Sequence, residues 1–140
     1  MKTNGIKKQH PEAPLVSVVD DDLSVRRSTR RLLCTAGLRV ETFASAEEFL
    51  LSGRAGESAC IILDFQMPGM NGLELQRKLT ENSIPAPIIF ITARASEDEQ
   101  RLAVQAGAVK FLHKPVSQEV LLLAIRSALG NPPIDERKMT

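Results

Sequence analysis

The stretch Ala59–Gly72, ACIILDFQMPGMNG, decides the fold of this chain. It opens with a short, β-branched apolar run, Cys60–Leu63, which is typical of a strand buried on both faces of a parallel sheet. The run stops at Asp64, and after a loop that contains Pro68 the chain resumes as a helix near Asn71. A carboxylate at the carboxyl end of such a strand lies where open α/β sheets bind ligands, so Asp64 is the first candidate functional residue.

The regions on either side repeat the same alternation of strand and helix. Strands are expected over Leu15–Val19, Arg39–Phe43, Cys60–Leu63, Ile88–Ile91 and Val109–Leu112. Helices, counting each capping serine, are expected over Ser24–Ala36, Ser45–Leu51, Gly72–Glu81, Ser96–Ala106 and Ser117–Leu129. Strict alternation with short connections predicts an α/β fold, a single doubly wound five-stranded parallel sheet of order 2-1-3-4-5 with five helices, as in flavodoxin-like folds.

Length and composition indicate one ordinary globular domain. With 140 residues we expect an N-terminal tail over 1–13, the domain over 14–130, and a C-terminal tail or start of a linker over 131–140. The net charge of +1 gives no reason to expect nucleic-acid or membrane binding. The two cysteines read as reduced thiols, no leader segment is visible and no apolar run is long enough to span a bilayer, so a cytoplasmic location is expected.

Polar residues stand at the expected carboxyl ends of four strands. They are Asp20-Asp21, Asp64, Thr92 and Lys114, and the predicted topology brings them to one edge of the sheet. Carboxylates this close repel one another, and a hard cation such as Mg²⁺ removes that conflict. The lysine and the threonine hydroxyl would suit an anion, and a phosphoryl group fits best, with Asp64 as a carboxylate nucleophile.

Each of these residues taken alone has a simpler interpretation. Asp22 and Ser24 in particular fit a cap on the first helix as well as they fit a place in the site, and the pattern does not choose between the two. A single Asp-Asp pair is weak evidence for a metal site. The four matched strand ends together carry the prediction.

At this point the sequence resembles the receiver domain of two-component response regulators over Leu15–Leu129. The resemblance rests on several motifs with matching spacing rather than on one. The motifs are Val19-Asp20-Asp21, Leu63-Asp64 followed by Met67-Pro68-Gly69-Met70-Asn71-Gly72, Ile91-Thr92-Ala93, and Phe111-Leu112-His113-Lys114-Pro115.

The resemblance implies that Asp64 accepts a phosphoryl group from the phosphohistidine of a sensor histidine kinase or phosphotransfer protein. It further implies that Asp20, Asp21, Asp64 and the backbone carbonyl of Gln66 hold Mg²⁺. A receiver of this kind is a regulator and not an enzyme.

The resemblance also implies a switch. Thr92 and Lys114 would contact the phosphoryl oxygens, the Lys114–Pro115 bond would be cis, and Phe111 would turn inward when Thr92 moves. The surface formed by the fourth helix, fifth strand and fifth helix would then control homodimerisation or an output partner. Within the last helix, Val120 is expected in the core stripe, and at least one of Leu122 and Leu123 is expected to face outward.

Two other functions compete with this interpretation. A haloacid-dehalogenase-type phosphatase also uses D-x-D at a strand end, and Asp20-Asp21-Asp22 fits that pattern, but it leaves the loop after Asp64 unexplained. A receiver-like docking module that takes no phosphate is the second alternative. The chain is either a stand-alone receiver or a fragment of a longer regulator, one that acts in transcription for example.

Overall fold

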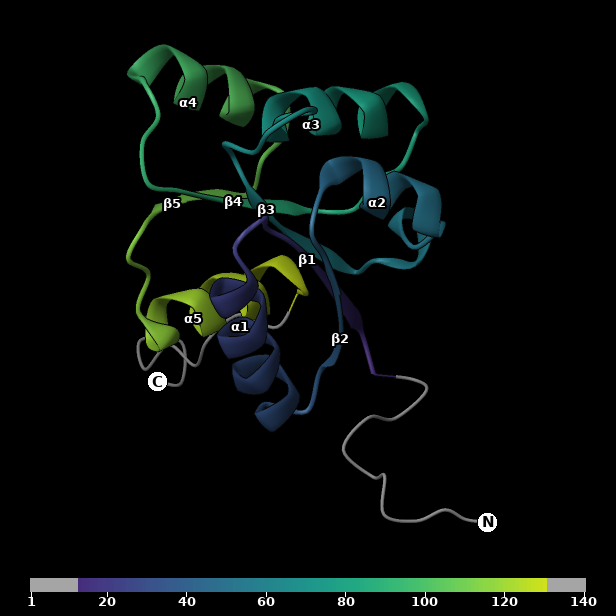
Figure 1. Cartoon of the computed structure of the whole chain (residues 1–140), viewed down its shortest axis with the longest axis vertical. Coiled ribbons are helices and arrows are strands. Elements are labelled where there is room, and N and C mark those ends of the chain that lie inside the picture. Colours follow the sequence, from purple (N-terminus) through teal and green to yellow (C-terminus); the bar gives the residue numbers. More distant parts are fainter. Residues whose placement is uncertain (1–12, 131–140) are drawn as a thin grey trace, which may run out of the picture.

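The computed structural model describes residues 13–130, which form one five-stranded parallel sheet flanked by helices (Figure 1). The strand order is β2-β1-β3-β4-β5, so the predicted fold class is confirmed. The predicted tail over 131–140 and nearly all of that over 1–13 lie outside the described residues. The strands are β1 Leu15–Val19, β2 Arg39–Phe43, β3 Cys60–Asp64, β4 Ile88–Thr92 and β5 Lys110–His113; the helices are α1 Leu23–Thr35, α2 Ala46–Ser52, α3 Gly72–Glu81, α4 Glu97–Gln105 and α5 Gln118–Ala128.

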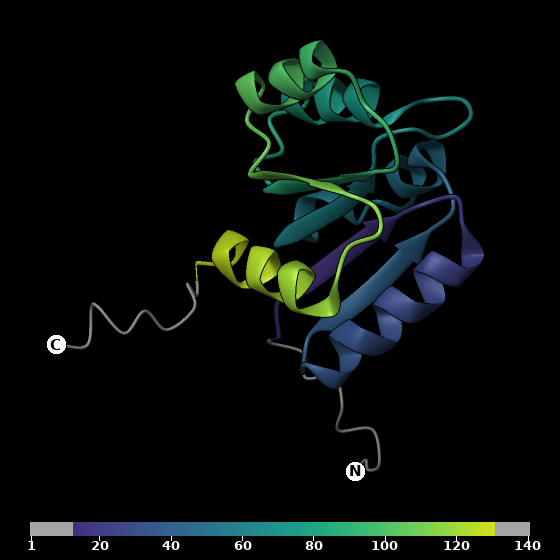
Figure 2. The same ribbon diagram turned by 90° about the vertical axis from the view of Figure 1, so that its left-hand side faces the viewer.

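The helices cover both faces of the sheet. Helices α2, α3 and α4 lie on one face, and α1 and α5 lie on the other, as Figures 1 and 2 show from two sides. The three central strands are buried along their whole length, which for β3 confirms the prediction made from the apolar run Cys60–Leu63. Successive side chains of these strands enter opposite cores: Ile61 and Leu63 pack with α2 and α3, whereas Cys60 and Ile62 pack with α1 and α5.

Side-chain caps fix where the helices begin, close to the strand ends. The carboxylate of Asp22 accepts hydrogen bonds from the N–H groups of Ser24 and Val25 and caps α1, which is one of the two roles that its sequence pattern allowed. Asn71 and Glu74 form a reciprocal capping box at the start of α3. The capping box therefore fixes the end of the β3–α3 loop at Asn71, the residue directly before α3.

The structure differs from the expected elements mainly in a short 3-10 helix, Ala55–Glu57, between α2 and β3, and at the strand ends. Strand β5 begins one residue later than expected, at Lys110, and β3, β4 and β5 each end one residue later than expected. Val120 was wrongly assigned to the core: its side chain is exposed, whereas Leu121, Ala124 and Ile125 form the buried stripe of α5. Neighbouring positions on a helix point about 100° apart, so a stripe centred on Leu121 turns Val120 outward.

Leu123 also faces outward on α5, as the width of the apolar stripe predicted. Within residues 13–130, no helix combines the length and the apolar character that crossing a membrane requires.

Candidate functional site

The strand register brings the predicted site residues to one edge of the sheet. Val19 of β1 lies beside Leu63 of β3, so Asp20, which follows Val19, and Asp64, which follows Leu63, are neighbours at the strand ends. Thr92, the last residue of β4, is paired with His113 at the end of β5, so Lys114 emerges at the same edge. All strands are parallel, and their carboxyl ends therefore lie at the same edge of the sheet.

Three carboxylates and one ammonium group form the centre of this site. Carboxylate oxygens of Asp20, Asp21 and Asp64 lie within 4.8 Å of one another. The Lys114 ammonium nitrogen lies 3.3 Å from Asp20 Oδ2 and 3.5 Å from Asp64 Oδ2. Asp20 and Asp64 are buried, whereas Asp21 is exposed at the rim. One positive charge thus faces three negative charges in a partly desolvated pocket.

Burial and like-charge repulsion raise the pKa of Asp64. Desolvation, with a further contribution from the charge of Asp20, raises the pKa of Asp64 from 3.8 to about 6, although Lys114 opposes this rise. Burial alone would lower the pKa of Lys114, but Asp20 and Asp64 together raise it. The lysine is therefore protonated at neutral pH, and it offsets only part of the repulsion among the carboxylates.

Thr92 lies buried at the end of β4, with its hydroxyl engaged by the next loop. The hydroxyl donates a hydrogen bond to the carbonyl of Arg94 at 2.7 Å and accepts one from the N–H of Arg94 at 3.0 Å. Phe111 of β5 is half-buried, and its ring centre lies 5.3 Å from that of Phe65 and 5.6 Å from that of Phe90. The Lys114–Pro115 peptide bond is cis.

The loop between β3 and α3 begins directly at the site. The N–H of Gln66 donates to Asp64 Oδ1 at 3.2 Å, and the N–H of Phe65 donates to the carbonyl of Ile91 in β4. Gly72 is required where the loop returns, because a β-carbon there would lie 2.9 Å from both the carbonyl oxygen of Asp64 and the Cα of Phe65. The start of α3 is thereby pressed against the strand end that carries Asp64.

Two residues at this edge were missed by sequence reasoning. The guanidinium of Arg26 in α1 donates to the backbone carbonyl of Asp20 at 2.7 Å. Glu47 in α2 accepts the N–H of Met70 at 3.0 Å, although the two residues are 23 positions apart. Arg26 belongs to an arginine-rich helix face and Glu47 to an acidic first helical turn, both of which are ordinary solvent-facing patterns, so neither gave a usable signal.

Comparisons with known proteins identify the family to which this chain is similar. The model of the response regulator receiver domain matches residues 16–126. The response regulator protein TodT of Pseudomonas putida is 40% identical over 129 residues, which cover 92% of this chain and 57% of that protein. The chain thus spans little more than half the length of this curated relative.

Solved structures of similar proteins also superpose on this chain. The response regulator StyR superposes with a TM-score of 0.79 at 46% identity, covering 91% of this chain and 63% of that chain. The chemotaxis protein CheY4 of Vibrio cholerae superposes with a TM-score of 0.77 at 31% identity, covering 84% of this chain and 99% of that chain. With the fold, the strand-end carboxylates and the family match in agreement, the chain belongs to the response regulator receiver domains of two-component systems.

Proposed function

We propose that this chain accepts a phosphoryl group on Asp64 from the phosphohistidine of a sensor histidine kinase or phosphotransfer protein, in a Mg²⁺-dependent reaction. The observation that carries the proposal is the position of Asp64. It is a buried carboxylate at a strand end, within 4.8 Å of two further aspartates and 3.5 Å from an ammonium group. The chain is on this proposal a regulator that is itself modified, and not an enzyme.

The chemistry follows from the groups present. A carboxylate oxygen of Asp64 attacks phosphorus, the new P–O bond forms as the P–N bond of phosphohistidine breaks, and the electron pair remains on the imidazole nitrogen, which takes up a proton. With a pKa of about 6, Asp64 is mostly ionised at neutral pH and so available as the nucleophile. Lys114 lies within reach to neutralise charge on the transferring oxygens.

The donor set fits Mg²⁺. Hard oxygen ligands from one or two carboxylates, with water completing the shell, are what this ion takes in phosphoryl-transfer sites. Asp20, Asp21 and Asp64 offer such oxygens. The pKa of Asp64 is raised by desolvation first and by repulsion from Asp20 second, and a divalent cation would relieve that repulsion. The backbone carbonyl of Gln66, at the start of the loop after β3, is the further ligand we assign. Bound Mg²⁺ would supply positive charge to the phosphoryl oxygens.

The switch we propose begins at Thr92. Its hydroxyl is held by the backbone of Arg94, and contact with a phosphoryl oxygen would exchange these bonds for a charge-assisted one. Movement of the loop after β4 would alter the packing of Phe111, whose half-buried ring already contacts the two buried rings of Phe65 and Phe90. A packed aromatic ring with two positions is a known type of two-state element.

The output surface of this proposal is formed by α4, β5 and α5. It carries a group of large apolar side chains that are between 43% and 52% exposed, namely Leu102, Val104, Val109, Val120 and Leu123. Exposed large apolar side chains on these elements support a contact with a protein partner. We propose that phosphorylation changes this face and so controls homodimerisation or an output partner, which is a transcription-regulating module if the chain belongs to a longer regulator.

The intact mass of the protein after incubation with acetyl phosphate and Mg²⁺ tests the phosphoacceptor. We expect the wild type to gain ~80 Da, one phosphoryl group, and we expect the gain to be lost in Asp64→Ala and on removal of Mg²⁺. Absence of any adduct in the wild type would favour the docking module. Steady release of phosphate from unrelated phosphomonoesters would favour the phosphatase. An adduct that survives Asp64→Ala would mean that another carboxylate is the acceptor.

A further inference from the structure

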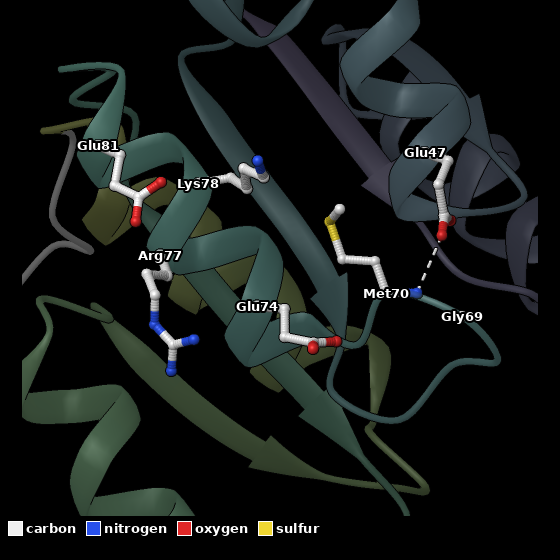
Figure 3. Close-up of a pocket in the computed structure, with 7 residues that line it drawn as sticks. All are labelled: Glu47, Gly69, Met70, Glu74, Arg77, Lys78 and Glu81. Carbon is white, nitrogen blue, oxygen red and sulfur yellow. Dashed lines mark hydrogen bonds between the residues drawn. The ribbon is translucent and has the colours of Figure 1, made fainter.

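Glu47 in α2 holds the loop that follows β3. Its carboxylate oxygen Oε2 accepts a hydrogen bond from the backbone N–H of Met70 at 3.0 Å (Figure 3). This hydrogen bond lowers the pKa of Glu47, so the ionised carboxylate is the form that holds the loop. The contact joins α2, which provides none of the assigned phosphoacceptor or metal residues, to the loop that begins at Asp64.

The loop is shaped to receive this carboxylate. Gly69 adopts a φ of +75°, and a β-carbon at that position would lie 2.8 Å from Oε2 of Glu47. A residue with a side chain at position 69 would be strained in the left-handed backbone conformation, and its β-carbon would also clash with the carboxylate of Glu47. The absence of a side chain at Gly69 and the hydrogen bond to Met70 are two separate features that fit the same group.

The other hydrogen bonds that hold the loop lie at its two ends, and between them the side chain of Met67 is buried in the core. Phe65 and Gln66 are held next to β3 and β4 by backbone hydrogen bonds and by the Asp64 carboxylate. Asn71 begins α3 through its capping box. Among the described residues, Glu47 makes the one hydrogen bond that fastens the segment 67–70 to another part of the fold.

Glu47 acts on the loop through its hydrogen bond to the backbone N–H of Met70 rather than through an ion pair. A groove of about 400 Å³ separates Glu47 and Met70 from the charged face of α3, which carries Arg77 and Lys78 (Figure 3). Within residues 13–130 neither of these cations forms an ion pair with Glu47. A neutral acceptor of the same shape should therefore replace the carboxylate.

We propose that Glu47 is a positioning residue for the metal site: by fixing Met70 it orders the loop that presents the carbonyl of Gln66 and thereby raises the affinity for Mg²⁺. This inference rests on the proposed function. A backbone carbonyl reaches its ligand position only as its loop allows, so a loop released at Met70 must be ordered again each time the ion binds. Loss of a partner that orients a ligand typically weakens metal binding 10- to 100-fold, and for this single contact we expect roughly tenfold.

The test measures Mg²⁺ binding to the unphosphorylated full chain by isothermal titration calorimetry. We expect Glu47→Ala to raise the Kd roughly tenfold and Glu47→Gln, whose amide oxygen still accepts the Met70 N–H, to stay within about twofold of the wild type. Glu48→Ala is the matched control, because Glu48 lies in the same helical turn and also accepts a backbone N–H, that of Ala44. It should leave the Kd unchanged.

A second measurement separates positioning from general damage. The rate of phosphorylation by acetyl phosphate, followed against Mg²⁺ concentration, should need more Mg²⁺ in Glu47→Ala but reach the wild-type rate at saturation. Gly69→Ala, which displaces the carboxylate from the other side, should show the same pattern and serves if Glu47→Ala does not fold.

Three results would overturn the inference. An unchanged Kd in both Glu47→Ala and Gly69→Ala, with normal binding by the wild type, would remove Glu47 from the metal site and leave the proposed function intact. A Glu47→Gln variant as weak as Glu47→Ala would show that charge acts and not the hydrogen bond. A wild type that binds no Mg²⁺ and takes up no phosphoryl group would refute the proposed function, and the inference with it.

Discussion

Replacing Asp64 by asparagine should stabilise the metal-free protein at alkaline pH. The asparagine has the shape of the aspartate without its charge, so it removes the repulsion from Asp20 and the desolvation of a buried carboxylate. The pKa of Asp64 rises from 3.8 to about 6 on folding, a shift of about 2 units. At ~1.4 kcal/mol per unit, the ionised form opposes folding by about 3 kcal/mol even with Lys114 nearby.

The sign of the pH dependence follows from this shift. Because the folded state binds the proton more tightly, its advantage is complete below pH 3.8 and is lost as the pH rises through about 6. The variant keeps a neutral group at every pH. We therefore expect Asp64→Asn to raise the free energy of unfolding by about 2–3 kcal/mol near pH 8 and by less than about 1 kcal/mol near pH 4.

Urea unfolding without Mg²⁺, at both pH values, measures this difference. The chain contains no tryptophan and no tyrosine, so far-UV circular dichroism is the suitable signal. Asp98→Asn, at an exposed carboxylate of α4, is the control and should show no comparable gain near pH 8. An Asp64→Asn variant that is no more stable than the wild type near pH 8, or equally stabilised at both pH values, would refute the reasoning. Added Mg²⁺ should stabilise only the wild type and so narrow the gap.

Three further changes test the site and its supports. Lys114→Met should raise the pKa of Asp64 above about 6, since the lost positive charge favoured the carboxylate; carboxyl ¹³C NMR titration checks this, and an unchanged or lower pKa would contradict it. Gly72→Ala should lower the free energy of unfolding by about 1–3 kcal/mol because its β-carbon meets backbone atoms, whereas Gly56→Ala, with nothing within 4 Å, should change little; equal losses in thermal unfolding would argue against the close contact. Asp22→Ala should cost about 1 kcal/mol in urea unfolding through loss of the α1 cap, and no loss at neutral pH would show that water replaces the cap.

The sequence predicted the fold because its apolar periods are unambiguous. The run Cys60–Leu63 is too short for a helix of a compact domain and too apolar for an exposed strand, and the structure buries it completely. The strand-end residues could be predicted to meet for the same reason, since parallel strands place their carboxyl ends at one edge. Val120 was misplaced because a helical pattern with apolar residues at six successive positions, 120–125, does not fix which side turns to the sheet.

The sequence by itself thus determined the order of strands and helices and which residues, Asp64 and Lys114 among them, stand at the strand ends. These depend on local patterns and on general rules of chain connection. Only the tertiary structure decided the distances among the carboxylates, the raised pKa of Asp64 and the contact between Glu47 and Met70. Electrostatic and hydrogen-bond energies depend on separations of a few ångströms between residues far apart in the chain, and packing alone sets those separations.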